Sequence, residues 1–271
     1  LECSTAVRAL SALGRVPDHA PFDKTIGEIA IFRSEIFTEE DPLPDWFNTF
    51  HVLTRERTVR RAITFVSGER FTEIAFRDAE RELRDPSVYE VTLVLPVQTD
   101  DPDVVDVVVV TKDVWSLRLT WFVETAGTVT NLSLGVVETN LAGLNDQLAV
   151  TYERGRGSWS VGPTYVSPRL AGSRWRFEAS HDLIWDRERD RLEGTRNALV
   201  VSRPLFDSLV EWGGSLSLAQ SSRNARRFSG ANVLTYDAAA TPQDDAIDER
   251  WRDESVSGSL QVTRSYGVAF K

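Results

Sequence analysis

Apolar and polar residues alternate along the second half of the chain, from about Asn131 onward. In residues 158–167, for example, Trp159, Val161 and Tyr165 are separated by serine, glycine and threonine. Successive side chains of a strand point to opposite faces, so one face of such a strand is apolar and the other is polar. The pattern predicts an antiparallel sheet with lipid or a protein core on one face and water on the other.

Each alternating run is about as long as a strand that crosses a membrane, and turn or polar residues follow it. We expect strands at 131–140, 145–154, 158–167, 175–185, 195–203, 208–220, 226–236 and 254–266. The connection at 142–145 is short, whereas 238–253 is long and acidic. Short turns on one rim and long loops on the other are typical of outer-membrane barrels.

Composition limits the alternatives. A chain of 271 residues can hold two domains. No segment approaches the roughly 20 apolar residues of a spanning helix, which excludes a helical membrane protein. The net charge of −10 argues against sequence-independent nucleic-acid binding. Methionine is absent and no signal peptide is present, so we expect a removed leader. Cys3 is the single cysteine, and we interpret it as incidental.

The first half of the chain has a different pattern. Residues 1–23 hold a possible short helix at 6–13 and then a linker with glycine and prolines. Strands are expected at 25–37, 88–95 and 104–111, and 114–127 is expected to be a connector. Two helices are expected between the first two strands, which predicts a small α+β domain of order β-α-α-β-β.

The helix ends are predicted from single residues. Thr54 is expected to cap the first helix, and Gly68 is expected to end it. Thr72 is expected to cap the second helix, and Pro86 is expected to stop it.

No motif predicts chemistry. Ser180, His181 and Asp182 are adjacent, so on a strand they alternate in direction and cannot form a catalytic relay among themselves. The acidic residues at 100–103 could hold calcium but lack the spacing of a calcium loop, which favours a solvated turn. The run at 154–157 could bind phosphate, but a hairpin turn is the simpler interpretation. We therefore expect no enzyme activity, no metal and no cofactor.

Several short motifs resemble a known family. Gly68-Glu69-Arg70-Phe71 resembles the turn between the two helices of a POTRA domain, and 80–84 fits the end of its second helix. Residues 135–143 are similar to the first barrel strand of that family with its turn, and 162–168 resemble the next hairpin. In this order, over about 24–186, the motifs resemble the BamA/TamA superfamily of bacterial outer-membrane barrels with POTRA domains.

The resemblance implies an α+β POTRA domain (β-α-α-β-β) followed by an antiparallel transmembrane β-barrel. The domains expected are an N-terminal linker at 1–23, a periplasmic POTRA-like domain at 24–118 and the N-terminal part of the barrel at 119–271. About eight strands fit this length, whereas family members have about sixteen, so a truncation at Lys271 is expected. A closed eight-stranded barrel is the alternative.

The function implied is assistance in the insertion or translocation of envelope proteins. The partners implied are nascent outer-membrane or secreted proteins, outer-membrane lipids and accessory lipoproteins, and the location implied is the bacterial outer membrane with the POTRA domain in the periplasm. Two alternatives remain open: a translocator barrel for a passenger or fused enzyme, and a soluble β-rich binding module.

The resemblance also implies two backbone sites. A substrate strand would add to the edge of the POTRA sheet by β-augmentation. A lateral seam would open beside the first barrel strand, where Gly135 would weaken the pairing. The residues expected at the strand-addition edge are Val88, Tyr89, Glu90, Val91, Thr92, Leu93, Val94 and Leu95. Those expected in the seam strand are Asn131, Leu132, Ser133, Leu134, Gly135, Val136, Val137, Glu138, Thr139 and Asn140.

Tryptophan and tyrosine side chains have two readings, as an interfacial girdle or as a sandwich core, and the repeated apolar face favours the girdle. The membrane-interface aromatics expected are Trp159, Tyr165, Trp175, Trp185 and Trp212.

Overall fold

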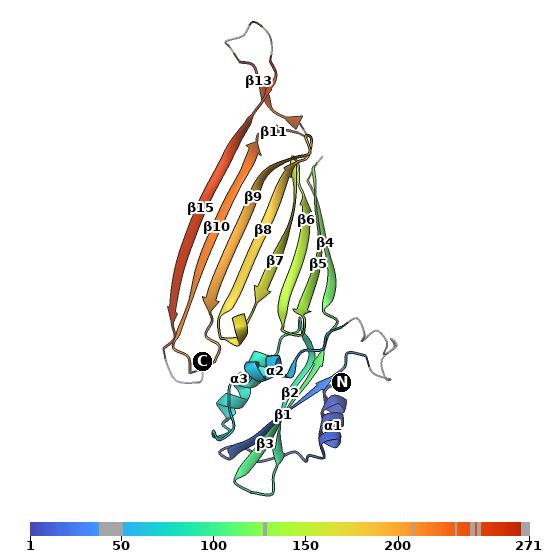
Figure 1. Cartoon of the computed structure of the whole chain (residues 1–271), viewed down its shortest axis with the longest axis vertical. Coiled ribbons are helices and arrows are strands. Elements are labelled where there is room, and N and C mark those ends of the chain that lie inside the picture. The colour runs from blue at the N-terminus through green and yellow to red at the C-terminus, as the bar shows by residue number, and fades with distance from the viewer. Residues whose placement is uncertain are drawn as a thin grey trace.

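The computed structural model describes residues 1–37, 51–126, 129–207, 209–230, 232–238, 242 and 245–266. These residues form a small three-stranded sheet with helices and a tall eight-stranded sheet that stands on it (Figure 1). Among the described residues, no helix is long and apolar enough to cross a membrane.

The small sheet follows the predicted order. It contains β1 (Thr25–Ser34), β2 (Tyr89–Gln98) and β3 (Val104–Asp113), arranged β1-β3-β2. The helices α2 (Glu56–Ala62) and α3 (Glu73–Leu83) lie between β1 and β2 in the chain. The central strand β3 is parallel to β1 and antiparallel to β2, and its run Val107–Val110 is buried on both faces. Continuous valine suits such a strand because both of its faces meet helices.

The observed helix ends agree only in part with those predicted from the sequence. Thr72 caps α3 as predicted, since its hydroxyl accepts a hydrogen bond from the amide of Ala75 at 3.2 Å. The predicted cap at Thr54 is wrong, because α2 begins one residue later and the Thr54 hydroxyl is buried against Asp113. The helix also ends well before Gly68, since Ile63 adopts an extended backbone.

Helices cover both faces of the small sheet. On one face α2 and α3 enclose a core in which Phe71 is fully buried and its ring meets those of Phe22, Phe65 and Phe76 at 5.8–5.9 Å. On the other face α1 (Glu2–Leu13) inserts Ala9 among valines of β2 and β3. The N-terminal segment expected to be a linker thus packs on the sheet.

The large sheet is a meander of antiparallel strands whose order is β15-β10-β9-β8-β7-β6-β5-β4. Its strands are β4 (Leu117–Ala126), β5 (Val129–Leu141), β6 (Asp146–Arg154), β7 (Ser158–Ser167), β8 (Arg176–Asp186), β9 (Arg191–Arg203), β10 (Trp212–Arg226) and β15 (Arg250–Arg264). A short helical turn, η2 (Leu170–Gly172), lies between β7 and β8. Within the described residues β4 and β15 do not pair with each other, so the sheet is not closed.

Two predicted segments are corrected. The expected connector at 114–127 contains β4, a full strand of the large sheet. The expected strand at 226–236 is not one, because Gly230 turns the backbone with φ +57. That region forms two small ribbons beyond the far end of the sheet, from β11 (Phe228–Ser229), β12 (Asn232–Val233), β13 (Thr235–Tyr236) and β14 (Ile247–Asp248) (Figure 1).

The strand registers separate the large sheet into two faces. Directly paired residues share a face. One continuous row of paired residues holds Leu119, Val136, Val150 and Pro163, and the neighbouring row on the opposite face holds Thr120, Gly135, Thr151 and Gly162. We call the first the apolar face and the second the polar face. The predicted alternation is therefore confirmed across β5, β6 and β7.

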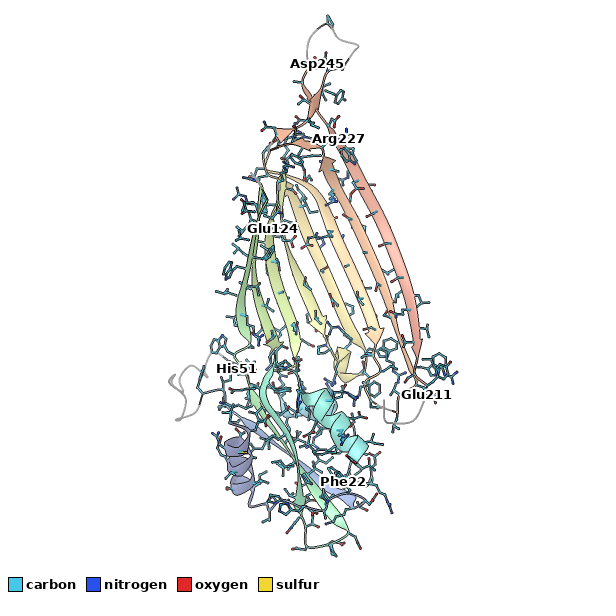
Figure 2. The ribbon with its side chains drawn as sticks, turned by 180° about the vertical axis from the view of Figure 1, so that it is seen from behind. Phe22, His51, Glu124, Glu211, Arg227 and Asp245 are labelled. Carbon is cyan, nitrogen blue, oxygen red and sulfur yellow. The ribbon has the colours of Figure 1, made fainter. Side chains whose placement is uncertain are left out.

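The two rims of the large sheet differ less in the length of their connections than expected. The end next to the small sheet holds the short turn at 142–145, and the far end holds the long connection 227–249, whose Asp245 lies near the tip (Figure 2). However, the far-end connections at 155–157 and 187–190 are also short. The expected gathering of long loops on one rim is thus limited to a single connection.

Candidate functional site

The expected strand-addition edge lies at the border of the small sheet. Residues 89–95 of this segment belong to β2, which is an outermost strand because only β3 pairs with it along its length. Val88 precedes the strand and its carbonyl accepts a hydrogen bond from the amide of Val114 at 2.8 Å. The structure therefore leaves one long side of β2 without a neighbouring strand.

Part of this side is already occupied. The amide of Gln98 donates to the carbonyl of Val16, and the amide of Asp18 donates to the carbonyl of Pro96, both at 2.9 Å. These bonds show that even-numbered residues of this part of β2 turn their backbone groups away from β3. Proline fits at position 96 because an outward-facing residue needs no ladder N–H. By the same alternation, the backbone groups of Thr92 and Val94 face outward, and no described residue pairs with them.

The expected seam strand lies elsewhere. Asn131–Asn140 forms most of β5, which pairs with β4 on one side and β6 on the other. The edge strand is β4, so the prediction that 131–140 is the first strand is wrong. Gly135 has another role, since a Cβ there would lie 2.5 Å from the hydroxyl oxygen of Thr120. Glycine is needed for close packing on the polar face.

The hydrogen bonds between β4 and β5 show which residues of β4 turn their backbone groups toward the unpaired side. The amide of Thr139 donates to the carbonyl of Ser116 at 3.0 Å, and the register pairs these two residues next to Leu117 and Glu138. Even-numbered residues of β4 therefore bond to β5, and the backbone groups of odd-numbered residues face outward. Leu119 and Trp121 are among the latter, with exposed side chains on the apolar face at 80% and 75%. This edge is thus open both to a strand and to apolar surroundings.

Sequence reasoning missed β4 although a signal existed. Leu117, Leu119, Trp121 and Val123 alternate with mostly polar residues, as in the strands that were predicted. The exception is Phe122, which lines a cavity of about 310 Å³ on the polar face together with Glu153 and Arg196.

The expected interface aromatics lie at both ends of the apolar face. Trp159 and Trp185 stack at 4.3 Å between ring centroids near the end remote from the small sheet. Tyr165 and Trp212 belong to the other end, where the Tyr165 hydroxyl bonds to Asp146 at 2.9 Å and the Arg264 guanidinium covers the Trp212 ring at 4.9 Å. Trp175 lies in the connection between β7 and β8 at this end and is 46% exposed.

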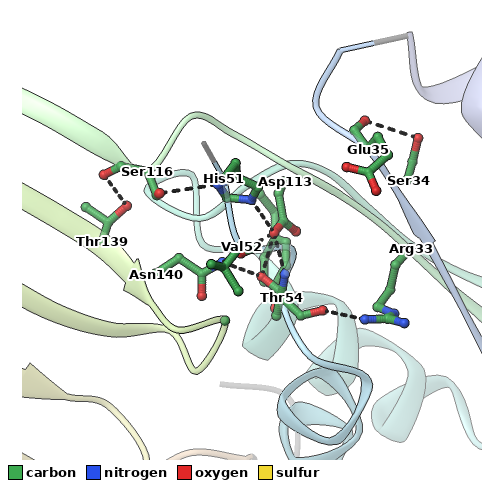
Figure 3. Close-up of polar contacts among 12 residues, drawn as sticks. Arg33, Ser34, Glu35, His51, Val52, Thr54, Asp113, Ser116, Thr139 and Asn140 are labelled. Atoms are coloured by element: carbon green, nitrogen blue, oxygen red, sulfur yellow. Dashed lines mark hydrogen bonds and ion pairs between the residues drawn. The ribbon is translucent and has the colours of Figure 1, made fainter. Parts of the chain in front are cut away.

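A buried polar cluster joins the two sheets (Figures 2 and 3). The carboxylate oxygen Oδ2 of Asp113 accepts from the amide and hydroxyl of Thr54 at 2.7 and 2.8 Å and from Asn140 Nδ2 at 3.3 Å. His51 Nε2 lies 3.1 Å from the same oxygen, and its Nδ1 lies 3.3 Å from the hydroxyl of Ser116. We call these residues the junction cluster. It fixes the end of β3 against the start of β4 and the end of β5.

The turn at 142–145 extends the junction. Asn145 donates from Nδ2 to the Tyr89 hydroxyl at 3.1 Å, and burial raises the pKa of Tyr89 to about 12. The carbonyl of Gly143 accepts from the amide of Arg55 at 2.9 Å and from the hydroxyl of Thr58 at 3.0 Å. The residues that enter α2 are thus held by a turn of the large sheet.

Ion pairs tie α3 to the same rim. Arg169 lies 2.8 Å from Glu82, and Arg174 lies 3.6 Å from the same carboxylate. Arg81 donates to the carbonyl of Phe206 at 3.3 Å. The small sheet and its helices therefore contact several connections of the large sheet. In the part of the chain that the structure describes, no cluster of histidine, cysteine and acidic side chains is arranged to hold a metal ion.

Comparison with known proteins adds information at the level of fold. No protein-family model matches the chain, and no curated protein matches it in sequence. The solved structure of BamA from Haemophilus ducreyi lacking POTRA domains 1–3 matches with a TM-score of 0.53 and 14% identity, over 89% of this chain and 44% of that one. The chain has a BamA-type fold. The expectation of a BamA-like fold is confirmed, and the chain spans less than half the length of the matched BamA.

A second solved structure, CdiB from Acinetobacter baumannii, matches with a TM-score of 0.49 and 11% identity, over 90% of this chain and 43% of that one.

Proposed function

We propose that this chain is part of an outer-membrane protein that assists the insertion or translocation of other envelope proteins, and that it does so through backbone edges. The observation that carries the proposal is the open β4 edge of a sheet with one apolar and one polar face. An unpaired ladder in lipid loses several kcal/mol for each unsatisfied group, so such an edge must be filled or guarded.

The small sheet would act as a periplasmic POTRA-like domain. Its β-α-α-β-β order and its open β2 edge support this assignment. An extended client strand would add beside Thr92 and Val94, whose backbone groups face outward. The part of the edge at 96–98 is covered by residues 16–18, so the client would bind at 90–94.

The large sheet would lie in the outer membrane with its apolar face toward lipid. The aromatic side chains at both ends of that face support this placement, because tryptophan and tyrosine prefer the membrane–water interface. The exposed apolar side chains of β4 would then meet lipid at the seam, where a client strand would pair with the outward groups of Leu119 and Trp121.

A direct test uses a photo-cross-linking amino acid at Glu90 in β2 and at Leu119 in β4 of the full-length protein. Both side chains are exposed, and the proposal expects adducts with nascent barrel precursors at both positions. Adducts with one secreted passenger would instead indicate a translocator. Absence of client adducts at both positions in a membrane-embedded protein would refute the proposal.

Thr92 allows a sharper test because its backbone amide faces outward. The variant Thr92→Pro removes that donor and leaves the bonds between β2 and β3 in place, whereas Thr92→Ala retains the donor. One hydrogen bond is worth about 1 kcal/mol, so client adducts at Glu90 should fall at least about fivefold in Thr92→Pro alone. Equal adduct yields in the two variants would show that clients do not bind this edge by strand addition.

Location is tested separately by membrane fractionation and heat-modifiable gel mobility of the full-length protein. Sedimentation with the outer membrane and a folded form that migrates differently until boiled are expected. A soluble product without a mobility shift would leave a β-rich binding protein as the better account.

A further inference from the structure

A cavity of about 90 Å³ lies where α2 meets the end of the large sheet next to the small sheet. Asp146 of β6 and Tyr165 of β7 line it, and the Tyr165 hydroxyl donates to the Asp146 carboxylate at 2.9 Å. Tyr165 pairs with Leu148, which is two residues from Val150 and therefore on the apolar face. The cavity thus lies at the end of the apolar face.

Two arginine side chains bring positive charge to this cavity. Arg61 comes from α2, and a Cβ at Gly172 would overlap its guanidinium, so the glycine makes room for that group against the connection between β7 and β8. Arg61 has no hydrogen bond or ion pair with any described residue. Arg169 donates from Nη2 to Glu82 at 2.8 Å, whereas its buried Nε has no partner in the described part of the chain. Both arginines thus keep N–H groups for a ligand.

The negative charge in the cavity has no cation either. No described basic side chain lies within ion-pair distance of Asp146, although Arg61 and Arg169 line the same cavity. Charges withdrawn from water are costly without a partner. A phosphate group would accept from the guanidinium groups, and a primary ammonium would donate to the carboxylate. The cavity has room for several water molecules and hence for a phosphate. Its charges therefore suit a ligand that carries both groups.

The apolar face begins at this cavity, which indicates what carries the two charged groups. Leu148 and Val150 follow Asp146 on the same face, and their side chains are exposed. Under the proposed function, on which this inference rests, these side chains meet lipid, and Tyr165 lies at the membrane–water interface. A soluble zwitterion would leave the leucine and the valine uncovered, whereas a phospholipid would cover them with its acyl chains.

We propose that this cavity binds the headgroup of one phospholipid that has a primary ammonium group, such as phosphatidylethanolamine. The phosphate accepts from the Arg61 guanidinium and from the Nε–H of Arg169, and the ammonium donates to Asp146. The acyl chains extend along Leu148 and Val150. One lipid molecule then joins α2 to the large sheet.

The test counts the lipids that stay bound when native mass spectrometry releases the full-length protein from nanodiscs of phosphatidylethanolamine and phosphatidylglycerol in equal amounts. The parent protein should retain one phosphatidylethanolamine. Arg61→Gln should lower this retention about tenfold, as expected for the loss of one charge-assisted hydrogen bond. Arg57→Gln is the matched control, because Arg57 is an exposed arginine of the same helix that does not line the cavity, and its lipid retention should equal that of the parent.

Asp146→Asn tests the ammonium contact separately. The variant keeps an oxygen that accepts from the Tyr165 hydroxyl and loses the negative charge. It should still retain a phospholipid through the arginines but should no longer prefer the ethanolamine headgroup to the glycerol headgroup. An unchanged preference in Asp146→Asn would overturn the assignment of the ammonium.

Two further results would overturn the site: equal retention of the two lipids by the parent protein, or equal retention of phosphatidylethanolamine by Arg61→Gln and Arg57→Gln. All three variants should keep heat-modifiable mobility, which shows that they fold. A membrane-embedded parent protein without the bound lipid would refute this site alone. A parent protein in the soluble fraction would instead overturn the proposed membrane location, so the two failures are distinguishable.

Discussion

Replacement of Gly143 by alanine measures how firmly the large sheet holds the small one. Gly143 has φ +71, and a Cβ there would lie 2.6 Å from the carbonyl oxygen of Leu53 and 3.3 Å from the amide nitrogen of Arg55. The left-handed backbone costs alanine about 1 kcal/mol relative to glycine. Moving the 53–55 segment away also loses the bonds from Arg55 and Thr58 to the Gly143 carbonyl, each worth about 1 kcal/mol. Opening of the junction should therefore become easier by about 3 kcal/mol.

Gly14→Ala is the matched control. Gly14 has φ +62 and no atom within 4 Å of the position a Cβ would take, so the control includes only the backbone contribution. The assay is native-state hydrogen exchange of the protein in lipid nanodiscs, read on peptides that cover Thr54 and Arg55. Gly14 lies outside the junction, so the control should leave junction opening unchanged, and about 3 kcal/mol corresponds to exchange about 150-fold faster in Gly143→Ala than in Gly14→Ala. Equal protection of these peptides in both variants would refute the reasoning.

Three further outcomes follow from the small sheet and its helices. Phe71→Ala should destabilise this domain by about 3–5 kcal/mol in urea unfolding, because the ring is fully buried; a loss below about 1 kcal/mol would contradict the packing. Because burial raises the pKa of Tyr89 to about 12 from 10.0, its contribution to stability is complete below pH 10 and is lost as pH rises toward 12. The alkaline loss of urea stability should therefore be smaller in Tyr89→Phe, and equal losses would contradict this. Thr72→Ala should cost about 1 kcal/mol through the lost cap of α3, whereas Thr72→Ser should retain most of it, as thermal melts would show.

The alternation of apolar and polar residues predicted those strands of the large sheet in which one face is apolar and the other is polar. Trp159, Val161 and Tyr165 share the apolar face as expected, because strand geometry depends only on neighbouring residues. The same reasoning separated His181 from Ser180 and Asp182, and the structure places Asp182 on the polar face with Arg196 at 2.9 Å. Local pattern is enough for such assignments.

The edge strand was missed because its pattern is imperfect. Phe122 places a large ring on the polar face of β4, beside Trp121 on the apolar face, so the alternation is broken at this one position. Missing one strand shifted the expected edge by one strand, to β5. Whether a strand lies at the edge depends on how all strands of the sheet pair, and the sequence pattern of one strand does not show this.

The junction cluster could not be predicted because its partners are distant in the chain. Asp113 bonds to Thr54 across 59 residues and to Asn140 across 27. Thr54 has the residue type of a helix cap and lies just before α2, so local reasoning assigned it to the helix. Tertiary structure used its hydroxyl for Asp113 instead, since that buried carboxylate needs donors.

The two open edges are close together in the chain, and this closeness has a testable consequence. Three residues, 114–116, separate the end of β3 from the start of β4, and hydrogen bonds of Ser116 with His51 of the junction cluster and with Thr139 of β5 hold them in place. Under the proposed function, a client strand on β2 is held at a fixed distance from β4, which raises its effective concentration there. Gly143→Ala should therefore lower client adducts at Leu119 while those at Glu90 stay unchanged, and Gly14→Ala should change neither. Equal falls at both positions would mean that the junction affects client capture rather than transfer between the edges.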